Sequence, residues 1–348
     1  MPDQRPFSVS YLLEDTVLFG GVKVVLRQAD LLAAQGHDVT IVSRGARPDW
    51  YDLKASFRQV DTFSRETVPP SDVTVATYWT TIGPAVSAAH RAVAHYCQGL
   101  EFTYTHNTAD HAAIETAYRT AIPALVVSAH LGEILAERFD RASRVVLQPL
   151  ESFWKPGLRR RMVRRPASVP RILVTGPWEG DWKGVRTALE AINQLRASGL
   201  IVEVVRISQY ELTDAEAELL EAAEYHHHIK PEAVASLVQG CDLLLAPSWE
   251  QEGFGLPVLE AFAAGVPVVA SDIRAFREFA SGAASLVPAQ DSAAFTSAAR
   301  HILSDPALWR HMRRAGLRVA DRYTEERATR SAEQALEWVA SGKRMPQK

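Results

Sequence analysis

The chain has 348 residues, a hydrophobic fraction of 47%, a charged fraction of 23% and a formal net charge of -3. This length favours two domains over one, and the composition is typical of a globular protein. The small net charge gives no support for a protein that binds nucleic acid over a broad surface. Because no run of about 18 apolar residues occurs, we expect no segment that crosses a membrane.

The two cysteines, Cys97 and Cys241, are far apart and lie in hydrophobic stretches. They form neither a disulfide framework nor a zinc motif, and a reducing cytosol fits better than secretion. The first residues, Met1 to Phe7, are polar and lack the apolar core of a signal peptide. We therefore predict a cytoplasmic protein.

Strands and helices alternate through the first half of the chain. We predict strands at Val9–Leu13, Val39–Val42, Val73–Ala76, Ala92–Tyr96 and Ala124–Val127. A helix follows Gly20-Gly21 and ends at Gly36, a usual helix terminator. This alternation predicts a parallel sheet with helices on both faces.

A second α/β unit begins near Pro170. We predict strands at Arg171–Thr175, Val202–Ile207, Asp242–Ala246 and Val266–Ala270, and helices at Gly184–Ala197, Asp214–Glu224, Val258–Ala264 and Glu325–Ala340. The predicted domains span residues 1–154 and 170–324, with a basic linker at 155–169 and a C-terminal helical segment at 325–348. The same alternation predicts a second parallel sheet.

The predicted linker contains the densest basic run of the chain, between Arg159 and Arg165. Its arginines are Arg159, Arg160, Arg161, Arg164 and Arg165. A run of like charges is most often a solvated surface, and we favour that interpretation. The alternative is peripheral contact with an anionic membrane surface or a partner.

The segment from Ser248 to Glu260 carries the clearest chemical signal. It follows a predicted buried strand, and ligands of open parallel sheets bind beyond the carboxyl ends of the strands. Gly253 and Gly255 remove side chains where a ligand could approach the backbone. Pro257 suits the first position of a helix, because its missing N–H would have no partner there. The segment is therefore predicted to join a strand to a helix through a ligand-binding loop.

The backbone N–H groups of Phe254, Gly255 and Leu256 then lie at a helix N-terminus, which is an anion site suited to a diphosphate. Glu252 and Glu260 flank this site. A carboxylate next to a phosphate is useful only where it faces hydroxyl groups, and a nucleotide sugar has hydroxyls on both sides of its diphosphate. Each glutamate alone is most simply a solvent-facing charge, but the combined pattern predicts a nucleotide-sugar site.

The run from Glu252 to Glu260, followed by Ala261 to Ser271, closely resembles the signature of retaining glycosyltransferases of family 4, in which two glutamates stand eight positions apart. The resemblance implies a GT-B fold, with two Rossmann-like doubly wound domains that face each other across a cleft. It implies that Glu260 holds the ribose hydroxyls and that Glu252 contacts the transferred sugar. It also implies that the helix from Glu325 packs back on the first domain.

Two further positions resemble the same family, and one departs from it. Gly20-Gly21 resembles the glycine loop that faces the donor phosphate and sugar from the N-terminal domain. Lys183 matches the phosphate-neutralising lysine, which would offset leaving-group charge without a metal. Pro177-Trp178 stands where the family usually has an arginine after the glycine that corresponds to Gly176.

Acceptor and sugar contacts are expected in the loops of the first domain. Gln98 takes the place of a histidine that the family often has near the sugar. Gln98 and Glu101 are therefore candidate site residues, with ordinary loop roles as an equal alternative. Trp79 and other aromatic residues of these loops could stack on sugar faces, although such residues more often serve in packing.

A metal site is not predicted at His226-His227-His228. Adjacent residues on a strand or helix point in different directions, and no second group of ligands is near in the sequence. No Asp-x-Asp pair occurs either. We expect no cofactor beyond the nucleoside-diphosphate sugar that serves as substrate.

These features predict a metal-independent retaining glycosyltransferase that moves a hexosyl group to a glycan, lipid or small-molecule acceptor. The resemblance suggests a same-face displacement, and no pair of carboxylates of the kind used by retaining glycosidases can be identified. One alternative is another sugar-nucleotide enzyme of the same fold, an epimerase or a phosphorylase, although a ribose-binding Glu260 speaks against a phosphorylase. The other is a non-catalytic donor-binding subunit of a glycan assembly complex, supported only by Pro177-Trp178.

Overall fold

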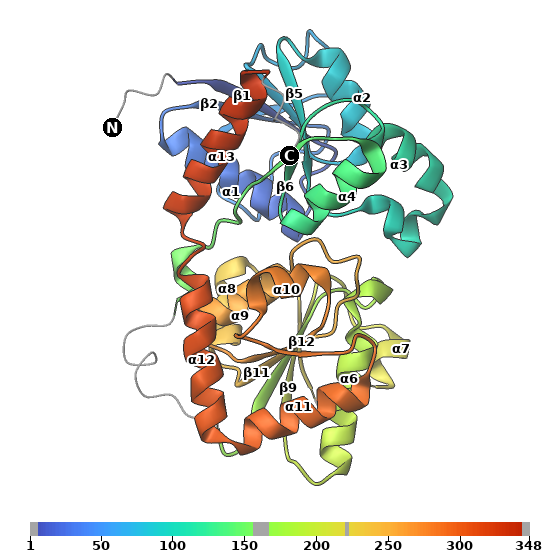
Figure 1. Ribbon diagram of the computed structural model, residues 1–348, viewed down its shortest axis with the longest axis vertical. Coiled ribbons are helices and arrows are strands. Elements are labelled where there is room, and N and C mark those ends of the chain that lie inside the picture. Colours follow the sequence, from blue (N-terminus) through green and yellow to red (C-terminus); the bar gives the residue numbers. More distant parts are fainter. Residues whose placement is uncertain (1–5, 156–166, 220–222, 343–348) are drawn as a thin grey trace. The chain divides into compact units, whose positions relative to one another are not determined.

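A computed structural model describes residues 6–155, 167–219 and 223–342. The chain divides into two compact units, one of Met1–Pro149 with Glu325–Lys348 and the other of Leu150–Thr324. Each unit is built around one parallel sheet (Figure 1). The basic run Arg159–Arg165 lies outside the described residues, so membrane contact there stays a prediction. No helix in the described part of the chain is long and apolar enough to cross a membrane.

The first sheet has seven parallel strands in the order β3-β2-β1-β4-β5-β6-β7. Their bounds are Ser8–Leu13 (β1), Asp38–Ser43 (β2), Ser56–Gln59 (β3), Val73–Ala76 (β4), Ala92–Cys97 (β5), Ala124–Val126 (β6) and Ser143–Val145 (β7). The inner strands are apolar because helices cover both of their faces. The edge strands β3 and β7 were not predicted, since they are short and largely polar or exposed.

Helices from both ends of the sequence cover this sheet. They are Gly20–Ala34 (α1), Trp79–Ala88 (α2), His111–Tyr118 (α3), Ala129–Phe139 (α4) and Glu325–Ala340 (α13), with 3-10 turns at Glu101–Thr103 (η1) and Thr105–Asp110 (η2). Helix α13 packs against α1 and contacts β4, β5 and β7 (Figure 1). Arg27 pairs with Glu325, and His37 Nε2 lies 3.1 Å from Glu333 Oε1. These contacts join the end of the chain to the first unit.

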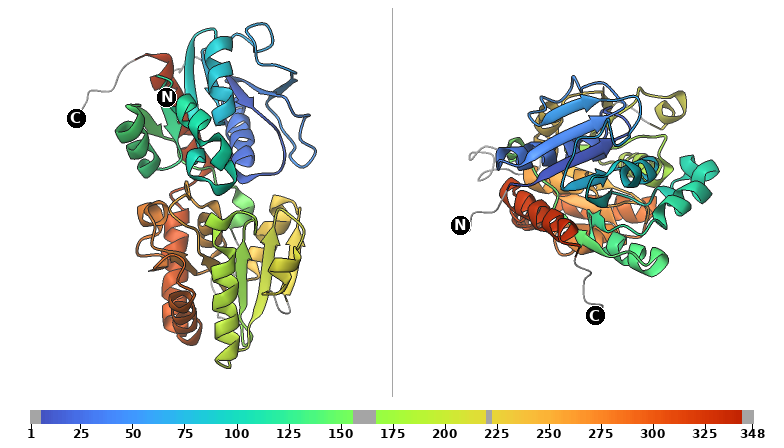
Figure 2. Two further views of the ribbon diagram at one scale, coloured as in Figure 1. Left: turned by 90° about the vertical axis from the view of Figure 1, so that its right-hand side faces the viewer. Right: turned by 90° about the horizontal axis from the view of Figure 1, so that it is seen from above.

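The second sheet has six parallel strands in the order β10-β9-β8-β11-β12-β13. The strands are Arg171–Thr175 (β8), Glu203–Ser208 (β9), Ala223–His227 (β10), Leu243–Ala246 (β11), Val268–Ser271 (β12) and Ser285–Val287 (β13). The helices are Val185–Ala197 (α6), Asp214–Ala217 (α7), Pro231–Gln239 (α8), Leu256–Ala264 (α9), Arg274–Ala280 (α10), Ser292–Ser304 (α11) and Pro306–Ala320 (α12), and Ser152–Trp154 (η3) and Asp181–Lys183 (η4) are 3-10 turns. Figure 2 shows helices flanking the strands in two further views.

The helix predicted from Asp214 to Glu224 is the main error in the second unit. Among the residues of that stretch that the structure describes, the helix α7 covers only Asp214–Ala217, and β10 begins at Ala223 and pairs in parallel with β9. Alanine and glutamate, which dominate this segment, favour helix, but strand pairing along β9 outweighs that local preference.

The boundary between the units also differs from the predicted one. The first unit ends at Pro149, before the predicted position of residue 154. Turn η3 packs against α8 and α9, the Trp154 side chain is buried, and Gln239 Nε2 donates to the Phe153 carbonyl at 2.9 Å. These contacts place the segment before the basic run in the second unit.

Candidate functional site

The order of the second sheet creates a switch point between β8 and β11. The chain moves outward from β8 toward β9 and β10, and then from β11 toward β12 and β13. Ligands of open α/β sheets bind at such a point, outside the carboxyl ends of the strands. The loop after β8 carries Lys183, and the loop after β11 carries the segment predicted to bind the donor.

Lys183 and Glu252 meet at this switch point. Lys183 Nζ donates to Glu252 Oε2 at 2.7 Å, and the two side chains are 20% and 9% exposed. Lys183 Nζ also lies 4.1 Å from the centre of the Trp182 ring, in cation–π contact. The structure thus brings together the two residues predicted as catalytic, which are 69 positions apart in the sequence.

The two loops can meet because a glycine allows close approach. Gly184 follows Lys183 with φ +66°, and a Cβ atom there would lie 2.2 Å from the Pro247 carbonyl oxygen. The Trp249 N–H donates to the Trp182 carbonyl at 2.8 Å and links the loops directly. Any side chain at position 184 would therefore separate Lys183 from the loop that carries Glu252.

Helix α9 begins at the end of the loop that follows β11. Gly255 precedes it with φ +92°, and a Cβ atom there would lie 2.3 Å from Phe276 Cε1. Leu256 occupies the first helical position, so Pro257 occupies the second position and not the predicted first one. In the described part of the chain, the N–H groups of Phe254, Gly255 and Leu256 have no acceptor. They can donate to an anion at the helix N-terminus.

The Phe254 side chain anchors this loop through contacts with other aromatic rings. It is 7% exposed and stacks on Phe279 with ring centres 4.6 Å apart. Its ring also meets Tyr323 edge-on at 5.7 Å. The aromatic cluster fixes the backbone around Gly253 and Gly255, so the N–H groups are held in place before any ligand arrives.

A pocket of about 330 Å³, including its open mouth, lies at this point. It is lined by Thr175, Gly176, Lys183, Ala246, Pro247, Ser248, Glu252, Gly255, Pro257, Val258 and Phe276. Among these lining residues Lys183 is the one cation and Glu252 the one carboxylate. The pocket can therefore bind an anion through Lys183 and the loop N–H groups, and hydroxyl groups through Glu252.

Several predicted donor residues lie outside the described pocket lining. Gly253 and Phe254 are buried, and Glu260 lies half-buried further along α9. At the departure from the family, Trp178 packs against the hydrophobic core, and the Arg186 guanidinium lies 5.1 Å from the centre of its ring. A partly buried aromatic residue thus lies in the segment where the resemblance implies an arginine.

The predicted residues of the first unit gather at the carboxyl edge of its own sheet. Gly20 and Gly21 open α1 after β1, and Trp79 begins α2 after β4, so they flank the switch point between those two strands. Gln98 follows β5, and its Nε2 donates to the Gly21 carbonyl at 3.1 Å. The structure therefore joins Gln98 to the glycine loop, which the sequence did not indicate.

Glu101 faces the interior of the first unit. The residue is 5% exposed, its carboxyl bonds to the Tyr118 hydroxyl, and Asn107 Nδ2 donates to its backbone carbonyl at 3.1 Å. Burial raises the pKa of Glu101 to about 7. This environment favours a structural role over the predicted contact with a sugar.

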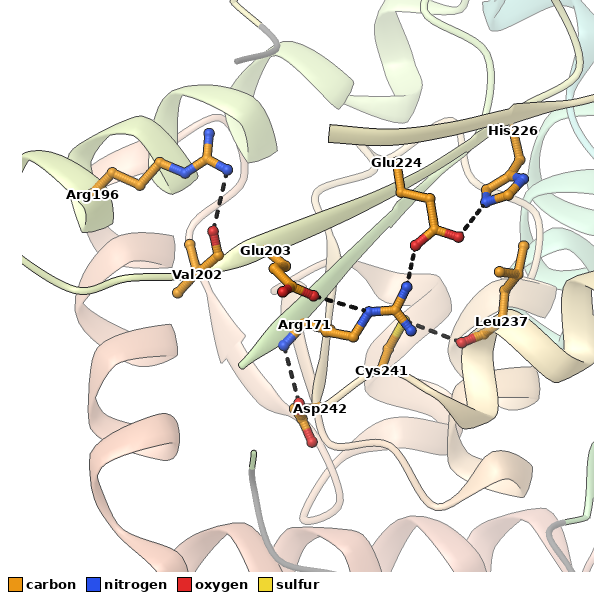
Figure 3. Close-up of polar contacts among 9 residues, drawn as sticks. All are labelled: Arg171, Arg196, Val202, Glu203, Glu224, His226, Leu237, Cys241 and Asp242. Carbon is orange, nitrogen blue, oxygen red and sulfur yellow. Dashed lines mark hydrogen bonds and ion pairs between the residues drawn. The ribbon is translucent and has the colours of Figure 1, made fainter. Parts of the chain in front are cut away.

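The three consecutive histidines lie at and just after the end of β10, where His226 joins a polar network. His226 Nε2 lies 2.7 Å from Glu224 Oε1, and Arg171 pairs with Glu224 and with Glu203, the latter at 3.4 Å (Figure 3). This network lies on one face of β8, β9 and β10. No group of three or more His, Cys, Asp and Glu residues suited to a metal occurs in the described ranges. The structure thus gives His226 a place in an ion-pair network.

Comparison with known proteins defines the class of the second unit. Residues 169–305 match the family model described as glycosyl transferases group 1. The phosphatidyl-myo-inositol mannosyltransferase of Mycobacterium leprae is 30% identical over 157 residues, which are 44% of this chain and 42% of that protein. The chain spans less than half the length of the curated relatives it matches.

The fold of the whole chain matches solved structures. HepE of Anabaena, in complex with UDP and glucose, gives a TM-score of 0.76 at 14% identity and covers 95% of this chain and 99% of that chain. Sucrose-phosphate synthase of Thermosynechococcus elongatus gives 0.74 at 17% identity and covers 97% and 100%. At such identities the likeness shows the fold alone, and it confirms the predicted GT-B fold. Residues 169–305 match the group 1 glycosyl transferases, and this match supports the family predicted from the sequence.

Proposed function

We propose that the chain transfers a hexosyl group from a nucleoside-diphosphate sugar to a glycan, lipid-linked or small-molecule acceptor, with retention of configuration and without a metal. The contact between Lys183 and Glu252 at the N-terminus of α9 carries this proposal. A cation beside unpaired N–H groups suits a diphosphate, and a carboxylate suits sugar hydroxyls. The names of the relatives, several of them mannosyltransferases, support a hexosyl donor.

In the proposed reaction, the diphosphate replaces Glu252 as the partner of Lys183. Glu252 is then released to accept hydrogen bonds from hydroxyls of the transferred sugar. Lys183 and the loop N–H groups stabilise the charge that develops on the leaving diphosphate, a role otherwise open to a metal ion.

Retention requires the acceptor to enter on the face from which the diphosphate leaves. The bond from the anomeric carbon to the diphosphate oxygen breaks, and a bond to the acceptor oxygen forms on the same face. A diphosphate oxygen takes the acceptor proton, so no protein nucleophile is needed. The protein contributes position and charge stabilisation.

Donor binding is the first test of this proposal. Thermal-shift measurements on the full chain with UDP, GDP, ADP and TDP sugars should reveal stabilisation by one nucleotide class, growing with the logarithm of ligand excess. Absence of stabilisation by every nucleotide sugar would contradict the proposal.

The preferred donor then serves in a transfer assay with and without chelator, with product configuration read by NMR. We expect chelator-insensitive transfer and a retained anomeric centre. Sugar conversion without an acceptor would instead identify an epimerase. Binding without transfer to any acceptor would favour a donor-binding subunit.

A further inference from the structure

A chain of contacts connects the interior of the first unit to the glycine loop. Gln98 Nε2 donates to the Gly21 carbonyl at 3.1 Å. A Cβ atom at Gly21 would lie only 3.3 Å from Gln98 Nε2, so the amide lies directly against the loop. The position of Gln98 therefore helps to set the conformation of Gly20-Gly21.

Hydrogen bonds from buried side chains hold the backbone next to Gln98. Cys97 Sγ donates to the Gly99 carbonyl at 3.1 Å, and the Tyr118 hydroxyl bonds to the same oxygen at 3.0 Å. The Tyr118 hydroxyl also bonds to the Glu101 carboxyl and lies 3.7 Å from Cys97 Sγ. Cys97 and Tyr118 are completely buried, and Glu101 is nearly so. Burial thus leaves water little access to these groups.

The number of available hydrogens decides the protonation of this cluster. The Tyr118 hydroxyl has one hydrogen, but it contacts two acceptors, the Gly99 carbonyl and the Glu101 carboxyl. Both bonds can form at once only if Glu101 is protonated and donates to Tyr118, which then donates to Gly99. An ionised Glu101 would take the Tyr118 hydrogen and leave the Gly99 carbonyl with the weaker thiol donor alone.

We propose that a protonated Glu101 and Tyr118 are positioning residues that act through Gln98, holding its backbone so that its amide keeps the glycine loop in the conformation for sugar transfer. The proposal rests on the proposed function for its effect on turnover. The proton arrangement itself rests on the contacts of the first unit.

The other titratable groups near Glu101 leave this arrangement intact at neutral pH. Burial raises the pKa of Tyr118 well above its usual value and that of Cys97 to about 12. The pKa of Tyr78 is also raised by burial, so all three stay protonated. Arg141 is the nearby cation, and it lies 3.3 Å from His95 Nδ1. Burial, and then Arg141, lower the pKa of His95, which stays neutral. Burial raises the pKa of Glu101 to about 7, so Glu101 is the group that titrates there.

The test compares kcat and donor KM across pH for the wild type, Glu101→Gln and Tyr118→Phe. We expect wild-type kcat to fall several-fold as pH rises through about 7, because ionised Glu101 withdraws the Tyr118 hydrogen from Gly99. Glu101→Gln keeps a donor at every pH, so its kcat should stay near the low-pH wild-type value. Tyr118→Phe should lower kcat at every pH, because the Gly99 carbonyl then loses its hydroxyl donor.

Tyr96→Phe is the matched control. Tyr96 is a fully buried tyrosine of β5 whose hydroxyl accepts from Gln148 Nε2 at 3.4 Å. We expect its kcat and pH profile to match the wild type. A falling limb that persists in Glu101→Gln, or a Tyr118→Phe profile equal to that of Tyr96→Phe, would overturn the proposal.

A second measurement does not depend on transfer activity. Infrared difference spectra between the wild type and Glu101→Gln should show one protonated carboxyl band that titrates near pH 7. Its absence at pH 6 would refute the protonated cluster even in an active enzyme. Its presence in a chain that transfers no sugar would refute the proposed function and the effect on turnover, while the protonation stands.

Discussion

Glu252 and Glu101 are two buried carboxylates at the carboxyl edges of different sheets, and they have opposite surroundings. As whole residues they are 7% and 5% exposed. Glu252 lies beside the Lys183 ammonium in an open pocket. Glu101 lies beside a tyrosine hydroxyl and makes no ion pair with any residue in the described ranges.

The difference shows what each edge can do. A carboxylate paired with a cation next to a pocket can exchange that cation for contacts with a ligand. A buried carboxyl without an ion-pair partner is stable mainly when neutral, since burial penalises its charged form. The carboxyl edge of the second sheet is therefore suited to charged ligands. The Glu101 cluster at the carboxyl edge of the first sheet instead fixes the shape of its loop.

The ion pair of Arg206 and Glu216 tests what a cation contributes to a buried carboxylate that is outside the described pocket lining. Arg206 Nε donates to Glu216 Oε1 at 2.6 Å, and both side chains are sealed in the second unit. Arg206→Met would leave a buried carboxylate unpaired, so we expect the free energy of unfolding to fall by about 3–5 kcal/mol. Denaturant unfolding measures this change, and donor affinity of the folded fraction should stay the same. A loss below about 1 kcal/mol would show that this buried pair contributes no more to stability than an exposed ion pair.

Lys183→Met removes the cation that pairs with Glu252 at the pocket. We expect kcat to fall by about 10²–10³-fold, the usual loss when one donor to a developing anion is removed. Thermal unfolding should change little, because water can reach Glu252 through the pocket. Lys155→Met is the control, since Lys155 pairs with Asp321 elsewhere in the second unit and should keep full activity. Near-normal turnover of Lys183→Met would remove Lys183 from the mechanism.

Glu101→Gln tests the unpaired carboxyl through stability. In the wild type the folded state holds the Glu101 proton more tightly than the unfolded state, so stability falls as pH rises from 4.5 to about 7 and then levels. We expect a loss of up to about 3 kcal/mol across this window. Urea unfolding at several pH values should show that this component is absent from Glu101→Gln.

Glu115→Gln provides the comparison on the same unit. Glu115 lies on α3 and pairs at the surface with Arg138. Its variant should keep the wild-type pH dependence. Identical pH dependence in the wild type and Glu101→Gln would show that Glu101 is not the titrating group.

The sequence indicated Gln98 and Glu101 equally, but the structure separates them. Gln98 bonds to the glycine loop at the edge, whereas Glu101 is sealed beneath it. The partner that decides this is Tyr118, 17 positions away on α3, and a contact between distant segments leaves no local pattern. Gly184 is similar, because its need for close approach to Pro247 depends on two loops meeting.

Features with a local physical cause were predictable. Strands such as β4 and β11 are buried throughout and largely apolar because both faces are covered. The glycines and Pro257 indicated the loop and helix start because their backbone limits are local. The edge strand β10 was missed because its polar sequence reflects exposure, and its pairing with β9 is not local.

Glu252→Gln should give the smallest effect. It tests directly whether the diphosphate replaces Glu252 as the partner of Lys183. The variant keeps the shape of the side chain but removes the charge that competes for Lys183. We expect the nucleoside diphosphate to bind more tightly by about 1 kcal/mol, the upper range for partly exposed ion pairs, while kcat falls because sugar hydroxyls lose a charged acceptor. Calorimetry with the nucleotide identified by the donor screen measures the first effect. Glu250→Gln, an exposed residue of the same loop outside the described pocket lining, should leave both quantities unchanged. Weaker nucleotide binding by Glu252→Gln would mean that Glu252 assists Lys183 in the bound state and does not compete for it.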